Sequence, residues 1–287
     1  TKMQMEDGNA YEQVCLAAWN SNLKVLEGLL EQVRKGGVSS TGYGPTHFAA
    51  SLGNVEVMEF LLASGVDKNE RDADGNSALM WVVSADGSED LMDALVDHGA
   101  NVNMQNFVGE TALFTACARG LEDKVEFLLE NGADAHIANL DGATPLHAAA
   151  GQGDSSLIEL LVRYGASVSA ADDEGDSPLH WAVREGKMEA AQALIQLGAS
   201  ISQCNEDGES ALELALSLDD EPMAKHLSTL GAKPRLVGPG LVVTDCSPLE
   251  VEDVHLVKDV NMIDMAKDMR GLSVRDDDWR ALRTVSI

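Results

Sequence analysis

Two stretches of the chain, DGATPLHAAAGQG at Asp141–Gly153 and EGDSPLHWAVREG at Glu174–Gly186, are near copies that start 33 residues apart. Further out in both directions, glycines that precede a Thr/Ser-Pro/Ala-Leu block recur at Gly75, Gly109, Gly142, Gly175 and Gly208, with a weaker copy after Gly42. The successive steps are 33, 34, 33, 33 and 33 residues. A fixed period of this size predicts an array of like units, each too small to bury a core alone.

One copy already predicts a pair of helices. Thr144 is placed to cap a first helix, and Pro145 suits the first helical position, where no N–H is needed. After Gly153, apolar residues return at helical spacing and stop at another glycine, which is typical of a second helix with a left-handed cap. The Asp- and Asn-rich link between units, as in ANLDGAT, has the turn chemistry of a hairpin.

The second apolar segments end in related sequences such as LLENGADAH, LVRYGASVS and LIQLGASIS. Together with the TPLH-type blocks, they resemble the ankyrin repeat over about residues 8–234. The resemblance implies an all-α fold, a solenoid of stacked helix-turn-helix units with projecting β-hairpin turns. We expect repeats at about 8–41, 42–74, 75–108, 109–141, 142–174, 175–207 and 208–234, the first serving as an N-terminal cap.

Three copies depart from the pattern. Gly44 and Thr46 replace the usual Thr and Leu in the second repeat, so its first helix should be less well capped. The third repeat has one extra residue near Asp86-Gly87, between its two helices. The seventh, DGESALELALSLDDEP, lacks the Pro and His and carries Leu-Asp-Asp where the loop glycine normally stands.

The period ends after Pro234, which predicts a separate C-terminal tail at 235–287. Ser247-Pro248-Leu249-Glu250 has the form of a capping box and predicts a helix over about 248–270. Three roles stay open for this tail: a degenerate eighth unit that caps the stack, an independently docking helix, or an autoinhibitory or partner-binding arm.

The net charge of the chain indicates which kinds of partner it can bind. The 287 residues hold Lys+Arg 20 and Asp+Glu 48, a net charge of -28. Residues 233–287 hold 8 Lys/Arg and 10 Asp/Glu, a balance of -2, which leaves -26 on residues 1–232. Such a polyanion is repelled by nucleic acid and by anionic membrane surfaces, so we expect neither as a partner and favour a basic protein.

Cysteine usage and hydropathy predict an intracellular protein of the cytoplasm or nucleus, monomeric when unbound. Cys15, Cys117, Cys204 and Cys246 are far apart, without the spacing of a disulfide framework or a zinc site. The sequence has no apolar stretch of the roughly 18 residues that a membrane span needs. The chain begins with Thr1-Lys2, which leaves open a targeting segment that has been removed.

The sequence predicts no catalytic function. It has no nucleophile beside a base, no metal cluster and no phosphate-binding loop, so we expect no cofactor and no metal. His147 and His180 lie in TPLH-type blocks, in which the resemblance implies that histidine ties adjacent repeats through hydrogen bonds.

The resemblance also implies where a partner binds: along a concave face made by the hairpin tips and the exposed side of the first helices. Two alternatives stay open: Asp74, Asp141 and Asp207 shape Asp-Gly turns, and the large rings pack between helices. The predicted partner-binding residues are Phe48, Asp74, Asn76, Trp81, Phe107, Glu110, Asp141, Asp173, Glu174, Asp176, Trp181, Glu185, Glu206 and Glu209.

We therefore expect a non-catalytic protein–protein interaction module whose acidic groove binds a basic segment, in the manner of a histone-tail reader or a chaperone of basic proteins. The alternative is a scaffold or regulatory subunit that binds a folded partner or enzyme, with the charge serving solubility. Asn103 resembles the hairpin asparagines that ankyrin-targeting hydroxylases modify, although Asn is also favoured in turns.

Overall fold

The structure, a computed structural model, describes residues 10–33, 42–85 and 88–233. By its contacts the chain divides into two units, Thr1–Asp245 and Cys246–Ile287, and the second lies wholly outside the described residues. The helix expected at 248–270 and the extra residue near Asp86-Gly87 therefore also lie outside them.

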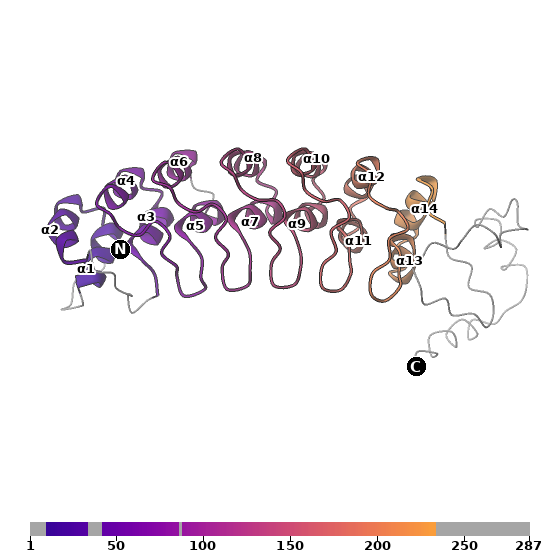
Figure 1. The fold of residues 1–287 in the computed structure, drawn as a ribbon, viewed down its shortest axis with the longest axis horizontal. Helices are drawn as coiled ribbons and strands as arrows, with labels where there is room; N and C mark the ends of the chain where they lie inside the picture. The colour runs from indigo at the N-terminus through magenta and orange to yellow at the C-terminus, as the bar shows by residue number, and fades with distance from the viewer. Residues whose placement is uncertain (1–9, 34–41, 86–87, 234–287) are drawn as a thin grey trace, which may run out of the picture. The chain divides into compact units, whose positions relative to one another are not determined.

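The described residues form fourteen α-helices in consecutive pairs and contain no β-strand (Figure 1). The first helices of the pairs are α1 Ala10–Trp19, α3 Pro45–Leu52, α5 Ala78–Ser84, α7 Ala112–Ala118, α9 Pro145–Gln152, α11 Pro178–Arg184 and α13 Ala211–Ser217. The second helices are α2 Leu23–Val33, α4 Val55–Ala63, α6 Glu89–Asp97, α8 Glu122–Glu130, α10 Ser155–Arg163, α12 Met188–Gln196 and α14 Glu221–Thr229. Hairpin turns project from the edge opposite the second helices (Figure 1).

Each helix pair follows from its local sequence. α9 starts at Pro145, and the loop after it turns at Gly153, whose φ of 95° lies in the left-handed region that glycine tolerates. Asp154 then caps α10, because its carboxylate accepts from the backbone N–H of Ser156 at 3.0 Å and of Leu157 at 3.3 Å.

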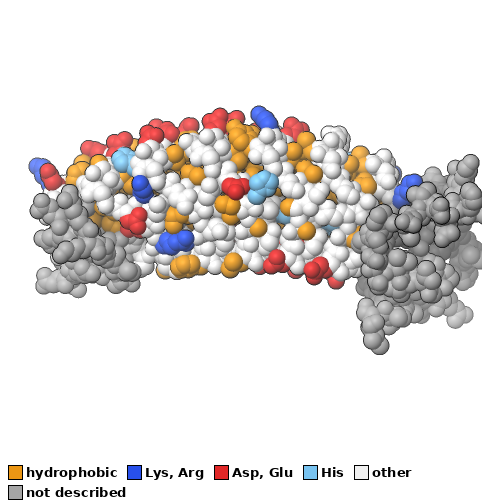
Figure 2. Space-filling model, viewed as in Figure 1, with side chains coloured by type: hydrophobic (Ala, Val, Ile, Leu, Met, Phe, Trp, Pro, Cys, Tyr) orange, Lys and Arg blue, Asp and Glu red, His pale blue; other side chains and the backbone are white. Residues whose placement is uncertain are grey.

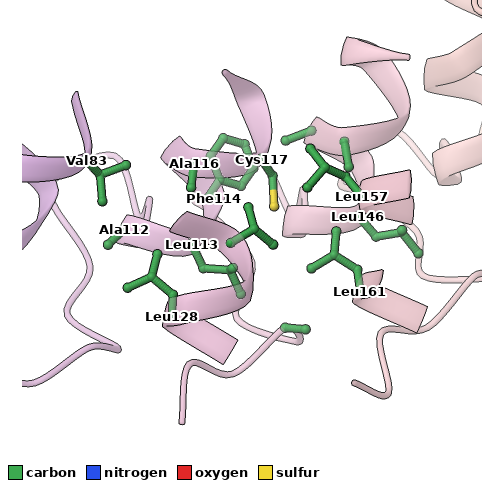
Figure 3. Packing of buried hydrophobic residues seen from close by; sticks show 14 of the residues in the cluster. Val83, Ala112, Leu113, Phe114, Ala116, Cys117, Leu128, Leu146, Leu157 and Leu161 are labelled. Carbon is green, nitrogen blue, oxygen red and sulfur yellow. The ribbon is translucent and has the colours of Figure 1, made fainter. Parts of the chain in front are cut away.

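The hydrophobic core runs without a break from repeat to repeat. Leu113 and Leu146, from the first helices of neighbouring repeats, are buried together with Leu128 and Leu157 from the second helices (Figure 3). Small residues such as Ala116 let the first helices approach closely. Because every repeat completes the core of the next, none has an independent core of its own.

The first helix of the second repeat, α3, has a cap that comes from outside its own helix pair. The Glu70 carboxylate, from the hairpin between α4 and α5, accepts from the Thr46 backbone N–H at 2.9 Å and from the Thr46 hydroxyl at 2.6 Å. Gly44 makes room, since a β-carbon there would clash with this carboxylate. The prediction of a poorly capped helix was incomplete, because the acceptor comes from the hairpin that follows the helix pair.

The seventh repeat replaces two missing features in its own way. Glu213 stands where other repeats have histidine and accepts from the Ser210 backbone N–H at 2.8 Å, which forms a capping box. Asp219 stands in place of the loop glycine and adopts the left-handed conformation with a φ of 57°. An Asp tolerates this region better than most residues, so the turn survives without glycine.

Three buried histidines link successive repeats. The Nδ1 atom of His147 accepts from the Thr144 backbone N–H at 3.0 Å, and a backbone N–H can only donate. Its Nε2 therefore carries the hydrogen and donates to the Asp176 carbonyl in the next hairpin at 3.1 Å. His47 bonds the Asn76 carbonyl in the same way at 2.9 Å, and His180 bonds that of Glu209 at 3.1 Å. These bonds confirm the role that the resemblance implied for His147 and His180.

Burial lowers the pKa of both His147 and His180 from the ordinary 6.5, because desolvation disfavours the charged ring. Hydrogen bonds to carbonyls and nearby carboxylates oppose this shift without cancelling it. Both rings are consequently neutral where they link the repeats.

We predict that Glu70→Ala lowers the free energy of unfolding by about 1–2 kcal/mol, since the Thr46 backbone N–H and hydroxyl lose the acceptor that Glu70 provides at the start of α3. Chemical denaturation followed by circular dichroism measures the change, and hydrogen exchange in α3 localises it. Glu59→Ala, which removes an equal charge from the exposed side of α4, should change stability by less than about 0.5 kcal/mol. Equal losses in the two variants would refute a capping role.

We predict that stability falls as the pH drops below 6.5 toward the lowered pKa values of the folded histidines. Between these pH values the histidines bind protons in the unfolded chain but not in the folded chain. This difference lowers the free energy of unfolding by at most about 1.4 kcal/mol per pH unit and per histidine. Unfolding midpoints at pH 7.5 and 5.5 test this. The double variant His147→Gln, His180→Gln should be less stable at pH 7.5 but less sensitive to acid, whereas the exposed His136→Gln should keep the native pH dependence.

Candidate functional site

Five hairpins in the described residues are each closed by an Asp or Asn side chain three residues before the turn glycine. In the hairpin between α10 and α11, Asp172 Oδ1 accepts from the backbone N–H of Glu174 at 3.1 Å and of Asp176 at 2.8 Å. The residues in this position are Asp72, Asn106, Asn139, Asp172 and Asn205. The turn is therefore shaped here, and no bond to the turn comes from the carboxylates of Asp74, Asp141 and Asp207 in this structure.

Two of these carboxylates also hold a tryptophan. The indole Nε1–H of Trp81 donates to Asp72 Oδ2 at 2.7 Å, and that of Trp181 donates to Asp172 Oδ2 at 2.8 Å. Desolvation by burial acts to raise the pKa of Asp72, but bonds from Trp81, Asn76 and the turn backbone together lower it. The carboxylate is charged and oriented at neutral pH.

The large rings also bridge neighbouring repeats. Trp181 meets His147 edge to face with ring centroids 5.6 Å apart, and Trp81 meets Tyr43 in the same way at 5.3 Å. Tyr43 in turn contacts Phe48 at 6.2 Å. Phe48, Trp81 and Trp181 are each half-buried, so each ring packs against the core and keeps part of its surface exposed.

Sequence reasoning missed the pairing of Asp and Trp, although the sequence carries its signal. Asp72 and Asp172 each precede a tryptophan by nine residues, whereas Thr115, Ala148 and Leu214 stand nine residues after an asparagine. The reason is chemical: a carboxylate offers a second acceptor to the indole N–H, whereas an amide presents N–H₂ there. In Asn106 that group donates to Asn76 Oδ1 at 3.0 Å instead.

Asp176 differs from its predicted role. It is 0% exposed, and its carboxylate accepts from Asn205 Nδ2 at 2.8 Å and pairs with Arg184. A charge removed from water needs such partners, which here come from α11 and from the hairpin between α12 and α13. Asp176 therefore stabilises the stack and is not available to a binding partner.

The remaining predicted residues fall into two groups by exposure. Asn76, Glu110 and Glu209 are half-buried beside the turns, and the pKa of Glu209 is raised by desolvation and by the nearby charge of Asp207. The exposed ones are Asp74, Phe107, Asp141, Asp173, Glu174, Glu185 and Glu206.

The tips of successive hairpins form a line that we call the tip row. It consists of the two residues before each turn glycine: Ala73, Asp74, Phe107, Val108, Leu140, Asp141, Asp173, Glu174, Glu206 and Asp207. Most members of the row are acidic, but Phe107, Val108 and Leu140 in its middle are apolar. Along the lower edge of Figure 2, hydrophobic atoms give way to acidic ones toward the C-terminal repeats.

A second acidic surface lies on the opposite edge, over the second helices (Figure 2). Its exposed carboxylates belong to Glu56, Glu59, Glu89, Asp90, Asp93, Asp97, Glu122, Asp123, Glu126 and Glu130. The charge of the repeats is thus spread over two edges and is not concentrated at the tips.

The Asn103 side chain links two repeats. Its Nδ2 donates to the Gly132 carbonyl at 3.0 Å, and its Oδ1 accepts from the Asp134 backbone N–H at 2.8 Å. Both amide atoms are therefore engaged in the stack, and modification of this residue stays a prediction.

In the described part of the chain, the His, Cys, Asp and Glu residues form no cluster suited to a metal ion. None of the helices there has the length and apolar character needed to cross a bilayer. Cys15 and Cys117 are buried and unbridged, and burial raises the pKa of the Cys117 thiol.

Comparison with known proteins agrees with this geometry. The family described as ankyrin repeats (3 copies) matches residues 14–106, 82–172, 113–204 and 146–237 in overlapping placements. The matches span well over half of the chain, which therefore belongs to the ankyrin-repeat family. Ankyrin repeats are typically non-catalytic modules that bind other proteins.

Two individual proteins illustrate the likeness. The ankyrin repeat domain of Bcl-3, a unique member of the IkappaB protein family, matches with a TM-score of 0.67 and 26% identity, over 78% of this chain and 100% of that domain. A probable serine/threonine-protein kinase of Dictyostelium discoideum is 36% identical over 75 residues, which are 25% of this chain and 8% of the kinase. The chain thus spans only a small part of that curated relative.

We predict that Asp172→Asn destabilises the protein by about 1–2 kcal/mol, because the new amide sets a donor against the Trp181 N–H. The change also relieves negative charge, so bulk electrostatics would predict the opposite sign. Asn139→Asp, at the same position in a repeat without tryptophan, should cost less than about 0.5 kcal/mol.

A double-mutant cycle with Trp181→Phe isolates the bond itself. We expect a coupling free energy of about 1 kcal/mol between positions 172 and 181, measured by denaturant unfolding. A coupling of zero would show that the tryptophan depends on packing alone.

Proposed function

We propose that the protein is a non-catalytic module that binds a basic segment of another protein along the hairpin tips and the adjoining exposed side of the first helices. The observation that carries this proposal is a run of exposed carboxylates from three successive hairpins: Asp141, Asp173, Glu174, Glu206 and Asp207. Of these, Glu174 lies 3.7 Å from Arg184, and the other four have no Lys or Arg within 4.0 Å among the described residues.

Unpaired carboxylates at a protrusion favour a basic ligand for two reasons. They attract it over the range of the screened field, and each forms a contact with Lys or Arg at little desolvation cost. The half-buried faces of Trp81 and Trp181 supply apolar area nearby that can also hold a cationic side chain. A histone-tail reader and a chaperone of basic proteins both fall within this class.

One observation favours a second candidate, a scaffold whose charge serves solubility. The exposed carboxylates over α4, α6 and α8 outnumber those of the tip row (Figure 2). A scaffold that binds a folded partner through apolar contacts would need no acidic edge in particular.

Binding of a lysine-rich peptide with glycine and serine spacers, measured by fluorescence anisotropy, separates the two candidates. We expect affinity to fall steeply between about 0.05 and 0.3 M ionic strength, as the Debye length shortens. The double variant Asp173→Asn, Glu206→Gln should weaken binding about three- to tenfold.

The matched control is Asp93→Asn, Glu126→Gln, which removes the same charge from the opposite edge. It should change affinity by less than about twofold at physiological salt. Equal effects of the two double variants would mean that only net charge matters, and the proposal would be abandoned.

A further inference from the structure

The tip row is held in fixed register by backbone hydrogen bonds between neighbouring hairpins. The N–H of Phe107 donates to the Asp74 carbonyl at 3.0 Å, and that of Leu140 donates to the Val108 carbonyl at 3.0 Å. The same bond joins Asp173 to Asp141 at 2.9 Å and Glu206 to Glu174 at 3.0 Å. Because each tip is tied to the one before it, side chains along the row keep constant spacing.

Three successive members of this row are apolar and exposed. Phe107 is 62% exposed, Val108 55% and Leu140 69%. These three side chains lie on two adjacent hairpins. The hairpin itself does not require them, since Asp173 and Glu206 occupy the place of Phe107 and Leu140 in the next two repeats. Exposed apolar side chains on two neighbouring hairpins offer a surface that a partner can cover.

The C-terminal part of the row is acidic. From Asp141 onward every member of the row carries a carboxylate: Asp141, Asp173, Glu174, Glu206 and Asp207. Beyond Phe107 and Val108 the row therefore changes from apolar to acidic between Leu140 and Asp141, and a complementary ligand must change from apolar to basic at the corresponding point.

We propose that the tip row binds an extended segment of a partner protein in which two apolar side chains lie at one end and Lys or Arg residues lie at the other. Neighbouring repeats are spaced by packed helices, about 8–10 Å apart. An extended chain advances about 3.3 Å per residue, so about three residues cover one step. Phe107 and Leu140 thus receive apolar residues about three positions apart, and the basic residues follow at similar steps over Asp173 and Glu206.

This inference rests on the proposed function and adds the apolar anchor that sets the register of the basic segment. A second copy of this chain is a poor occupant, because its net charge of -28 opposes self-association.

Three peptides of equal length test the proposal by fluorescence anisotropy. One has lysine at every third position, the second replaces the two lysines at one end by leucine, and the third places those two leucines next to each other. We expect the second to bind the native chain about tenfold more tightly than the third, because only its leucines match the spacing of the hairpins.

The double variant Phe107→Ser, Leu140→Ser should abolish this gain and leave the affinity for the all-lysine peptide unchanged. Leu216→Ser is the matched control, since Leu216 is 44% exposed but lies on α13, away from the tips. It should leave all three affinities unchanged, and thermal melts should show that every variant is folded.

The outcomes separate the two proposals. If the all-lysine peptide binds in a salt-dependent way and the spaced leucines add nothing, the apolar anchor is wrong while the proposed function stands. If no peptide binds the native chain, both fail. If light scattering shows a dimer that the Phe107 and Leu140 variant dissociates, this surface joins two copies and the anchor for a basic segment is overturned.

Discussion

The hairpins depend on one side chain each, an Asp or Asn whose Oδ1 accepts backbone N–H bonds of the turn. In the hairpin between α10 and α11 this side chain is Asp172. It accepts from the backbone N–H groups of Glu174 and Asp176, and these bonds orient the Asp176 carbonyl. That carbonyl receives His147 from the preceding repeat. A single turn contact thus sets both the hairpin and its link to the neighbouring helix, and the tip row inherits its spacing from the same bonds.

Whether this position is Asp or Asn depends on which neighbouring group its side chain must bind. Where Trp81 or Trp181 follows, the carboxylate supplies a second acceptor to the indole. Where a smaller residue follows, the amide can turn its N–H₂ toward the preceding hairpin, as in Asn106 and Asn205. Both solutions satisfy every buried polar atom of the turn, which is the condition for placing hairpins side by side.

The sequence predicted the helix pairs well because their signals are local and recur with the period. Proline, the cap residue and the loop glycine fall within one unit, so one copy predicts the others. The failures concern groups whose partners lie about one repeat away. The sequence around Thr46 does not show that Glu70 caps it, and the sequence around Asp176 does not show that Asn205 covers it. An exposed-looking acid in a turn is buried once the next unit is stacked against it.

The distribution of charge has a physical consequence for recognition. Carboxylates over α6 and α8 lie on the edge opposite the tips (Figure 2). At physiological ionic strength, the screening length is about 8 Å, so they contribute to the long-range attraction of a basic chain but little to its contacts. Attraction of that kind has no register, because a basic segment can slide along a row of equal charges. The apolar side chains of Phe107 and Leu140 would prevent such sliding. A charged side chain placed over them would lose hydration without gaining a partner.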